Sequence, residues 1–368
     1  MSSRFRFALA GSDDDADLRA LMAQGRMEGD IAVSFRREPS YFAGCIVQGD
    51  GAQVIKCMEV DSGRLAGHAC RSTLEVFVDG QPQRIGYLSD LRSFAQYRGG
   101  TLLARGFRFL RELHDADPVP FYYSVIYEGN DQAVRNLVGG RAGLPAYLDY
   151  GRVLTPAIQL GFPRRELSEP GLRVAQATAS QLPAIVNFLN AWQAQRQLAP
   201  VRHVAQFAPG SRYSGLRAED FLLALDVNDE IAGTIAIWNQ AAMRQTHVER
   251  YSRSLALVRP MFNLAARVLP FQPLPAVGGR VPYVYLACAC AREHSIGIFR
   301  MLLRAAYRQL RSSDAHYAIV GLHESDPFAT AFDDYRCIPA AGRLFLVHYA
   351  DAPAPSRAGI PFVEAGCI

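Results

Sequence analysis

The residues with the most evident chemistry lie between Ile85 and Leu113, where a predicted strand leads through a glycine pair into a periodic apolar segment. Arg98, Gly99, Gly100 and Thr101 stand at the start of the predicted helix. A helix start presents unpaired backbone N–H groups and a partial positive charge, and both attract anions. Because glycine adds no bulk, a phosphate can approach this backbone closely. The pattern therefore predicts a phosphate or pyrophosphate site, and the alternative is that the glycine pair only forms a turn.

Side chains that can move a proton lie on the predicted strands before and after the glycine pair and its helix. Asp90 lies on the predicted strand before the glycines, and Glu128 follows the next predicted strand. Either carboxylate could take a proton from an amine, directly or through a water molecule. Tyr122, Tyr127 and His68 could donate one. Each of these residues could equally have only a structural part, because polar groups inside proteins are generally satisfied by their neighbours.

The elements around these residues predict a mixed α/β fold. Apolar runs broken by turn signals indicate an antiparallel meander over residues 45–92, and its last strand leads into the glycine pair. The other elements expected in the first half are a strand at Phe5–Leu9, a helix within residues 11–25, a helix after the glycine pair, a buried strand at 121–127, a short helix capped by Asn130 and a strand at Tyr147–Leu154.

A charged, proline-bearing stretch at residues 162–171 is the best candidate for a linker between two halves. Short matches recur in the same order on its two sides: Arg6–Ala10 with Arg173–Ala177, Leu65–Gly67 with Ile231–Gly233, and Asn130–Ala133 with Asp326–Ala329. The shared order favours a tandem duplication. We expect an N-terminal domain at residues 1–160 and a C-terminal domain at 171–350, the latter with an extra segment at 240–281 that contains an added helix.

Composition argues against several other classes of protein. The chain has 368 residues with 49% hydrophobic and 20% charged content, which is ordinary for a globular protein. No apolar run is long enough for a membrane span, and the first residues turn acidic too soon for a signal peptide, so we expect a cytoplasmic protein without a membrane partner. Seven cysteines without CxxC spacing favour neither a disulfide framework nor a metal site. A net charge of +4 without a dense basic block does not imply nucleic acid.

The stretch from Asp90 to Gly100, followed by a helix, a strand and Asn130-x-x-Ala133, resembles the GCN5-related N-acetyltransferases. In that family a loop between the fourth strand and a helix holds the acetyl-CoA pyrophosphate, and a splay between the fourth and fifth strands aligns the pantetheine and the thioester. The resemblance implies contacts with the pantetheine arm from Leu91, Arg92 and Ser93, with the pyrophosphate from Arg98, Gly99, Gly100, Thr101 and Leu102, and with the thiol end from Asn130 and Ala133. Gln96, the alternative first residue of the loop motif, is a further cofactor-binding candidate.

The loop departs from the family pattern in either register, because the last small residue is replaced by Thr101 if the motif starts at Gln96 and by Leu103 if it starts at Arg98. The carboxylate and the tyrosine that the family often uses would fall at Ile85 and Leu137. The resemblance therefore supplies no general base or acid, and Asp90, Glu128 and Tyr122 are the candidates that the chain itself offers.

The second half carries the matching elements in weaker form. Residues 282–290 would be its key strand, followed by Arg292-x-x-Ser295-x-Gly297 and a helix to Leu310. The resemblance implies that this half serves as a scaffold or as a wall of the acceptor site. The implied function is transfer of an acetyl or related acyl group from acetyl-CoA to a primary amine of a small molecule or peptide, by direct attack and without a metal. Two alternatives stay open: an acyl-CoA-binding regulator without turnover, and a transferase for aminoacyl or longer acyl groups.

Overall fold

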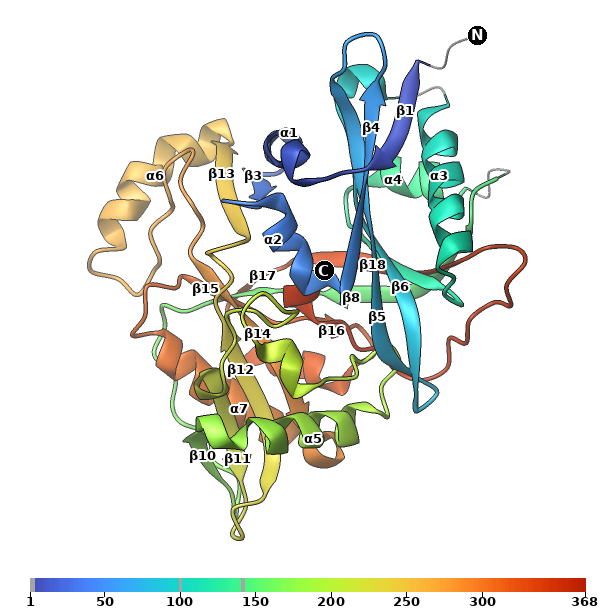
Figure 1. The fold of residues 1–368 in the computed structure, drawn as a ribbon. Helices are drawn as coiled ribbons and strands as arrows, with labels where there is room; N and C mark the ends of the chain where they lie inside the picture. Colours follow the sequence, from blue (N-terminus) through green and yellow to red (C-terminus); the bar gives the residue numbers. More distant parts are fainter. Residues whose placement is uncertain (1–3, 99–100, 140–142) are drawn as a thin grey trace.

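The computed structural model describes residues 4–98, 101–139 and 143–368. Its strands form two large mixed sheets and one small antiparallel sheet, and helices cover the large sheets (Figure 1). The chain is therefore a mixed α/β protein, as predicted. Among the described residues, no helix has the length and apolar content needed to cross a bilayer.

The first sheet has the order β1-β4-β5-β6-β7-β18-β8-β16. Its strands are β1 (Phe5–Leu9), β4 (Gly51–Glu59), β5 (Leu65–Val78), β6 (Gln81–Ser93), β7 (Tyr122–Tyr127), β18 (Ala341–His348), β8 (Ala146–Leu154) and β16 (Leu322–His323). The first four strands pair antiparallel, and β6 pairs parallel with β7. β18 pairs antiparallel with both β7 and β8.

The second sheet has the order β10-β11-β12-β14-β15-β9-β17. Its strands are β10 (Arg173–Gln176), β11 (Phe221–Leu225), β12 (Ile231–Trp238), β14 (Tyr283–Ala291), β15 (Tyr317–Ile319), β9 (Ala157–Gln159) and β17 (Cys337–Ile338). As in the first sheet, an antiparallel set ends in a strand, β14, that pairs parallel with the next strand, β15. The two large sheets therefore share one order of connection.

Seven α-helices lie in the described residues: α1 (Asp15–Gln24), α2 (Tyr41–Cys45), α3 (Leu102–Ala116), α4 (Asp131–Leu137), α5 (Leu182–Gln193), α6 (Arg253–Ala265) and α7 (Ile296–Leu310). Short 3-10 helices occupy Ser12–Asp14, Ile46–Gln48, Ala95–Tyr97, Ala179–Gln181, Val204–Phe207, Ala218–Asp220, Arg292–His294, Pro327–Asp334 and Ala365–Cys367. α3 connects β6 to β7, and α7 connects β14 to β15, so each large sheet has a helical crossover at the same place.

The elements predicted around the glycine pair are confirmed. β4, β5 and β6 form the meander, and α3 packs onto the sheet through Phe107 and Leu110, which are buried. Asn130 caps α4, because its side-chain oxygen accepts a hydrogen bond of 3.2 Å from the backbone N–H of Ala133. The helix expected in the extra segment is α6. Asp326, which matches Asn130 in the sequence comparison of the two halves, precedes a 3-10 helix instead. Its carboxylate accepts a hydrogen bond of 2.9 Å from the backbone N–H of Phe328.

Each large sheet contains at least one strand from the other half of the chain, and β16 of the second half lies at the edge of the first sheet, beside β8. β18 belongs to the second half by sequence but lies between β7 and β8 of the first sheet, while β9, just after β8, lies between β15 and β17 of the second. Periodicity in the sequence gives the face of a strand and not its partner, so this exchange was not predicted. The division into domains at 1–160 and 171–350 stays a prediction, and it does not describe the exchange.

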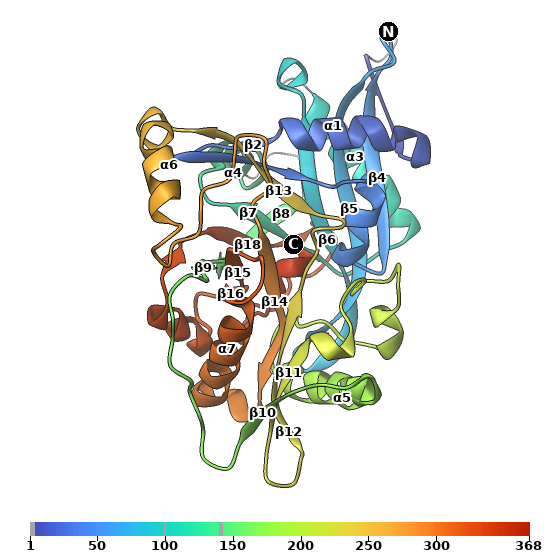
Figure 2. The same cartoon turned by 90° about the vertical axis from the view of Figure 1, so that its left-hand side faces the viewer.

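A third sheet, β13-β3-β2, joins the two halves (Figure 2). β13 (Gln245–Tyr251) comes from the extra segment and pairs antiparallel with β3 (Ile31–Arg36), beside β2 (Arg26–Met27). Glu249 on β13 accepts hydrogen bonds from Ser34 at 2.6 Å and from Arg36 at 2.7 Å. The extra segment is thus anchored to the first half of the chain.

Candidate functional site

A β-bulge interrupts β6 eight to ten residues before the glycine pair. Ser89 pairs with Cys70 and Arg92 pairs with His68, so Asp90 and Leu91 together face a single residue of β5. Asp90 has a φ of +55°, in the left-handed region that few non-glycine residues adopt. The same bulge recurs in β14, where Cys288 has a φ of +51° and the register shifts against β12. Two equivalent bulges are a point of correspondence between the halves that the sequence did not reveal.

The strands beside the bulge separate early. Among the described residues, β6 and β7 pair only at Gly86 with Tyr122 and at Tyr87 with Tyr123, although β6 runs on to Ser93. Gly86 permits this contact, since a Cβ there would lie 2.0 Å from the Tyr122 ring. Beyond the pairing, the backbone of β6 from the bulge onward is not covered by β7. Leu91 is accordingly 52% exposed.

Asp90 is held by a buried polar cluster on the α1 and α2 side of the sheet. The Arg37 guanidinium forms an ion pair with its carboxylate, and Tyr41 donates a hydrogen bond to it at 3.2 Å. The Arg37 side chain is only 2% exposed. Burial alone would raise the pKa of Asp90, but Arg37, with smaller contributions from His68 and Arg92, outweighs burial and lowers it. Asp90 is therefore an anion at neutral pH and a weak proton acceptor.

His68 belongs to the same cluster. Its Nδ1 lies 3.1 Å from the Tyr41 hydroxyl, while its Nε2 has no hydrogen-bond partner among the described residues. Burial lowers the pKa of His68 to about 3, despite the nearby Asp90 carboxylate. The imidazole is thus neutral at physiological pH, which argues against a role as a cationic donor.

The other two predicted catalytic residues lie elsewhere. Glu128 is solvent-exposed and pairs with Arg152, which donates at 2.6 Å. Tyr122 is buried under α3, where its hydroxyl accepts from Arg71 at 3.0 Å and lies 2.9 Å from His114 Nδ1. Burial raises the pKa of Tyr122. The structure does not bring Asp90, Glu128 and Tyr122 together into one constellation.

The residues expected to bind a cofactor lie along one path from the bulge to α3. Leu91, Gln96, Arg98 and Thr101 are exposed, while Arg92, Ser93 and Leu102 are half-buried. Gly99 and Gly100 lie outside the described residues. Leu103, whose bulk was a departure from the family pattern, packs into the core beneath α3 and not into the helix start. Asn130 is exposed at the start of α4, followed by the half-buried Ala133.

The start of α3 has no charge neutralising it among the described residues. Arg98 forms no ion pair with them, and Thr101, the N-cap residue, makes no side-chain capping hydrogen bond. No described side chain accepts a hydrogen bond from the backbone N–H of Asp90 or Leu91. No described side chain therefore takes the place that an anion could occupy at the start of α3 or that a carbonyl oxygen could occupy at the bulge of the first half.

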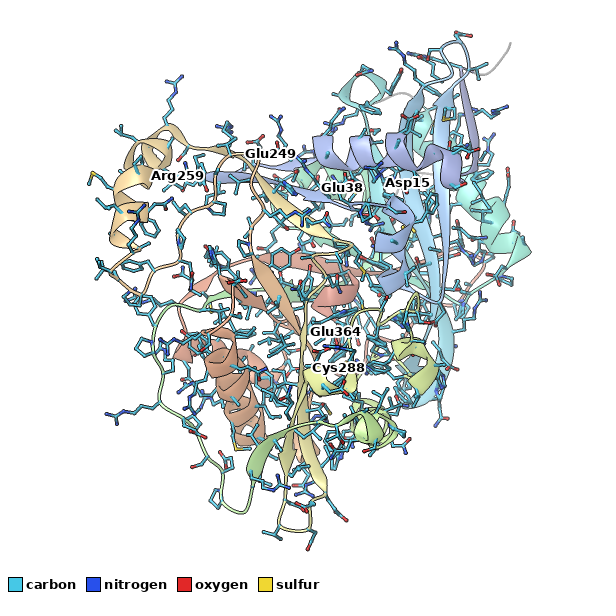
Figure 3. All side chains as sticks on the ribbon, turned by 60° about the vertical axis from the view of Figure 1, so that its left-hand side comes forward. Asp15, Glu38, Glu249, Arg259, Cys288 and Glu364 are labelled. Carbon is cyan, nitrogen blue, oxygen red and sulfur yellow. The ribbon has the colours of Figure 1, made fainter. Side chains whose placement is uncertain are left out.

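The equivalent features of the second half are occupied by the chain's own carboxylates. Arg292, the counterpart of Arg98, is paired with Asp226 at 3.1 Å. At the start of α7 the Glu169 carboxylate lies against Gly297, because a Cβ built there would be 2.5 Å from Glu169 Oε1. At the bulge the backbone N–H of Cys288 donates to Glu364 Oε2 at 2.9 Å (Figure 3).

Glu364 is buried and is also needed for charge balance. Its carboxylate lies 3.5 Å from Arg202, whose side chain has no exposed surface. Arg212 is buried nearby, and its Nε and Nη1 find no partner among the described residues. The second bulge is thus a structural position in which Glu364 compensates buried guanidinium groups.

Arg244, from the extra segment, lies at the junction of the halves. It helps to lower the pKa of Asp90, and it opposes the rise that burial gives to the pKa of Tyr127 and Tyr285. Its guanidinium donates at 2.9 Å to the backbone oxygen of Gly366. Arg37, Tyr41 and Arg244 were not predicted as site residues, because each is distant in sequence from the motif and lies in no recognisable pattern of its own.

The described residues contain no group of three or more His, Cys, Asp or Glu side chains placed to hold a metal ion. No protein-family model matches the sequence, and no curated protein matches it either.

Solved structures do share the fold. N-myristoyltransferase of Saccharomyces cerevisiae with bound myristoyl-CoA is 9% identical, with a TM-score of 0.61 over 99% of this chain and 90% of that one. A probable N-acyltransferase of Enterococcus faecalis V583 is 9% identical, with a TM-score of 0.53 over 94% and 72%. A GCN5-related N-acetyltransferase of Anabaena variabilis is 11% identical, with a TM-score of 0.52 over 93% and 72%. The chain therefore has the fold of the GCN5-related N-acyltransferases, which confirms the resemblance at the level of fold.

Proposed function

We propose that this protein is an N-acyltransferase that binds an acyl-CoA along β6 and the start of α3 and transfers the acyl group to a primary amine. The fold supports acyl transfer in general terms. The observation that carries the assignment to one half is the contrast between the two helix starts and bulges. Carboxylates of Glu169 and Glu364 lie at the second set, and no side chain of the described residues lies in the same way at the first.

The residues of the first half fit the parts of an acyl-CoA. Arg98, Thr101 and the first amides of α3 would hold the pyrophosphate, aided by the partial positive charge of the helix start. The exposed edge of β6 at Leu91, Arg92 and Ser93 would align the pantetheine arm. The bulge amides would donate to the thioester carbonyl. Bound there, the cofactor supplies an activated acyl group.

Asp90 has a positioning role in this proposal. Because Arg37 and Tyr41 hold its carboxylate, Asp90 fixes the left-handed backbone of the bulge and so the direction of the neighbouring N–H groups. Direct attack by an amine held next to the thioester gains much of its rate from proximity, and the proton can leave through water. Glu128 and Tyr122 stay untested candidates, the first on the surface and the second in the core.

We further propose that the chain is a tandem of two halves of the same fold, at 1–160 and 171–350, which exchange strands: β16 and β18 lie in the first sheet and β9 lies in the second. The shared order of connection and the equivalent bulges support this. The second half then serves as scaffold and, through Arg244 and β13, as a wall of the acceptor site between the halves.

A free-thiol release assay tests the function. Acetyl-CoA, a medium-chain acyl-CoA and myristoyl-CoA would each be offered with polyamines, amino acids, aminoglycosides and short peptides. We expect amine-dependent release of CoA for at least one pair. The long chain is included because one structure of the same fold holds myristoyl-CoA.

Cofactor binding without amine-dependent CoA release would contradict the enzyme assignment and favour an acyl-CoA-binding regulator. The pairing of Asp90 with Arg37 is the observation that favours this second candidate, since it removes one potential base. Amine-dependent CoA release from myristoyl-CoA but not from acetyl-CoA would indicate a transferase for longer acyl groups instead of an acetyltransferase.

A further inference from the structure

The helix α6 exposes an apolar stripe. Leu257 is 81% exposed, Met261 73% and Leu264 64%, and Val268 just beyond the helix is 84% exposed. Their spacing of four, three and four residues places them on one face of a helix. No residue of α6 is buried. Four large apolar side chains in one exposed row are unusual on a soluble surface and indicate a contact with something else.

The orientation of this stripe is fixed by the opposite face of the helix. Phe262 packs against Phe271 with ring centroids 5.6 Å apart, and Asn263 exchanges hydrogen bonds of 2.8 and 3.0 Å with the backbone of Leu274. Arg259 lies 5.5 Å from the centre of the Tyr251 ring. Because these contacts hold the inner face, the stripe points away from the protein. Figure 3 labels Arg259 on α6, at the edge of the molecule.

Within the segment that carries the stripe, the charged side chains have one sign. Residues 252–291 contain four arginines, Arg253, Arg259, Arg267 and Arg280, and no aspartate or glutamate. None of the four forms an ion pair with a described residue. Arg259 lies on the inner face, but helical spacing places Arg253 and Arg267 beside the stripe. An apolar stripe flanked by these two arginines is complementary to an anionic phospholipid surface, in which the apolar side chains enter the headgroup boundary and the guanidinium groups meet phosphates. The stripe is also convex, and a protein partner would have to supply a groove to receive it.

We propose that α6 docks the protein onto anionic phospholipid membranes, lying in the plane of the interface with Leu257, Met261 and Leu264 inserted. This differs from the expectation, drawn from the sequence, that the protein has no membrane partner. It gives the added helix a role outside the acyl-transfer site. The proposal does not depend on the acyl-transfer function, since binding to lipid is measured without any acyl-CoA.

Sedimentation with lipid vesicles tests it. The full-length protein is mixed with vesicles of phosphatidylcholine alone or of phosphatidylcholine and phosphatidylglycerol in equal parts. We expect binding to the anionic vesicles only, weakening as salt is raised. The double variant Leu257→Gln/Met261→Gln should lose at least about tenfold in affinity, because apolar burial is lost. Arg253→Gln/Arg267→Gln should lose on the order of tenfold and should reduce the salt dependence.

Val227→Gln is the matched control. Val227 is 82% exposed, like Leu257, but lies in the turn between β11 and β12, away from α6 in both ribbon views (Figures 1 and 2). It should bind as the wild type does. Sedimentation velocity without lipid distinguishes a contact between copies of the chain. The proposal is overturned if the wild type does not bind anionic vesicles, or if the α6 variants bind these vesicles as well as the wild type does. It is also overturned if the wild type is a dimer that Leu257→Gln/Met261→Gln dissociates.

Discussion

Replacing Asp90 by asparagine distinguishes a positioning role from a catalytic one. The Arg37 side chain is 2% exposed and that of Asp90 12%, so the substitution leaves a buried guanidinium without its carboxylate. Breaking such a buried pair from one side costs about 3–5 kcal/mol. Asparagine can still accept the hydrogen bond from Tyr41, and Arg37 keeps a contact of 2.8 Å with the Cys45 sulfur, so we expect the lower end of that range.

Urea unfolding followed by circular dichroism measures the cost. Wild type, Asp90→Asn, Arg37→Met and the double variant form a double-mutant cycle. The double variant should lose less free energy of unfolding than the two single variants lose together, by at least about 1 kcal/mol. Glu128→Gln is the matched control, because its pair with Arg152 is solvent-exposed. It should change the free energy of unfolding by less than about 1 kcal/mol.

The effect of the Asp90–Arg37 pair on the free energy of unfolding should depend on pH. Arg37 lowers the pKa of Asp90 below its ordinary value of 3.8, so the pair stabilises the fold above pH 4 and loses its effect as pH falls through the folded-state pKa. The difference between wild type and Asp90→Asn should therefore shrink in acid. The reasoning is refuted if Asp90→Asn unfolds like the wild type and instead flattens the pH profile of CoA release, which is the behaviour of a general base.

Two further predictions concern stability. Burial lowers the pKa of His68 from its ordinary 6.5 to about 3, so the folded protein resists protonation and the free energy of unfolding should fall as pH drops below 6.5. Between pH 7 and pH 5 this one group would lower that free energy by about 2 kcal/mol. His68→Gln should therefore reduce the slope of the unfolding free energy against pH in that window. An unchanged slope would contradict a buried neutral imidazole. Glu364→Ala leaves Arg202 buried without a carboxylate and should lower the free energy of unfolding by about 3 kcal/mol or more. The protein that stays folded should bind the same number of acyl-CoA molecules as the wild type. An unchanged free energy of unfolding in urea would contradict the role given to Glu364.

The first half of the fold was predictable because its signals are local. The meander up to β6, the helix α3 and the cap at Asn130 depend on turn residues, apolar spacing and one side-chain contact within a few residues. The added helix α6 was predictable for the same reason. The anion site at Arg98 and Thr101 could be proposed because a helix start is itself local.

The parts that were not predictable depend on distant partners. The exchange of β9 and β18 pairs residues that lie between 158 (Tyr317 with Gln159) and 225 (Val347 with Tyr122) positions apart, and no periodicity records it. Asp90 was assigned as a possible base because nothing in the sequence shows Arg37 beside it, 53 positions earlier. Glu169 and Glu364 come from stretches without any motif, yet they are the residues that distinguish the second half from the first.

Isothermal titration of acyl-CoA into a matched pair of variants tests the central claim most directly. Thr101 and Ser295 are the N-cap residues of α3 and α7, at equivalent places in the two halves. A glutamate at either position would repel a pyrophosphate bound at that helix start. We predict one acyl-CoA per wild-type chain, loss of binding in Thr101→Glu and in Gly99→Glu, and unchanged binding in Ser295→Glu, with circular dichroism confirming that all variants fold. Binding that survives Thr101→Glu and Gly99→Glu but is lost in Ser295→Glu would contradict the account, because the acyl-CoA would then occupy the second half.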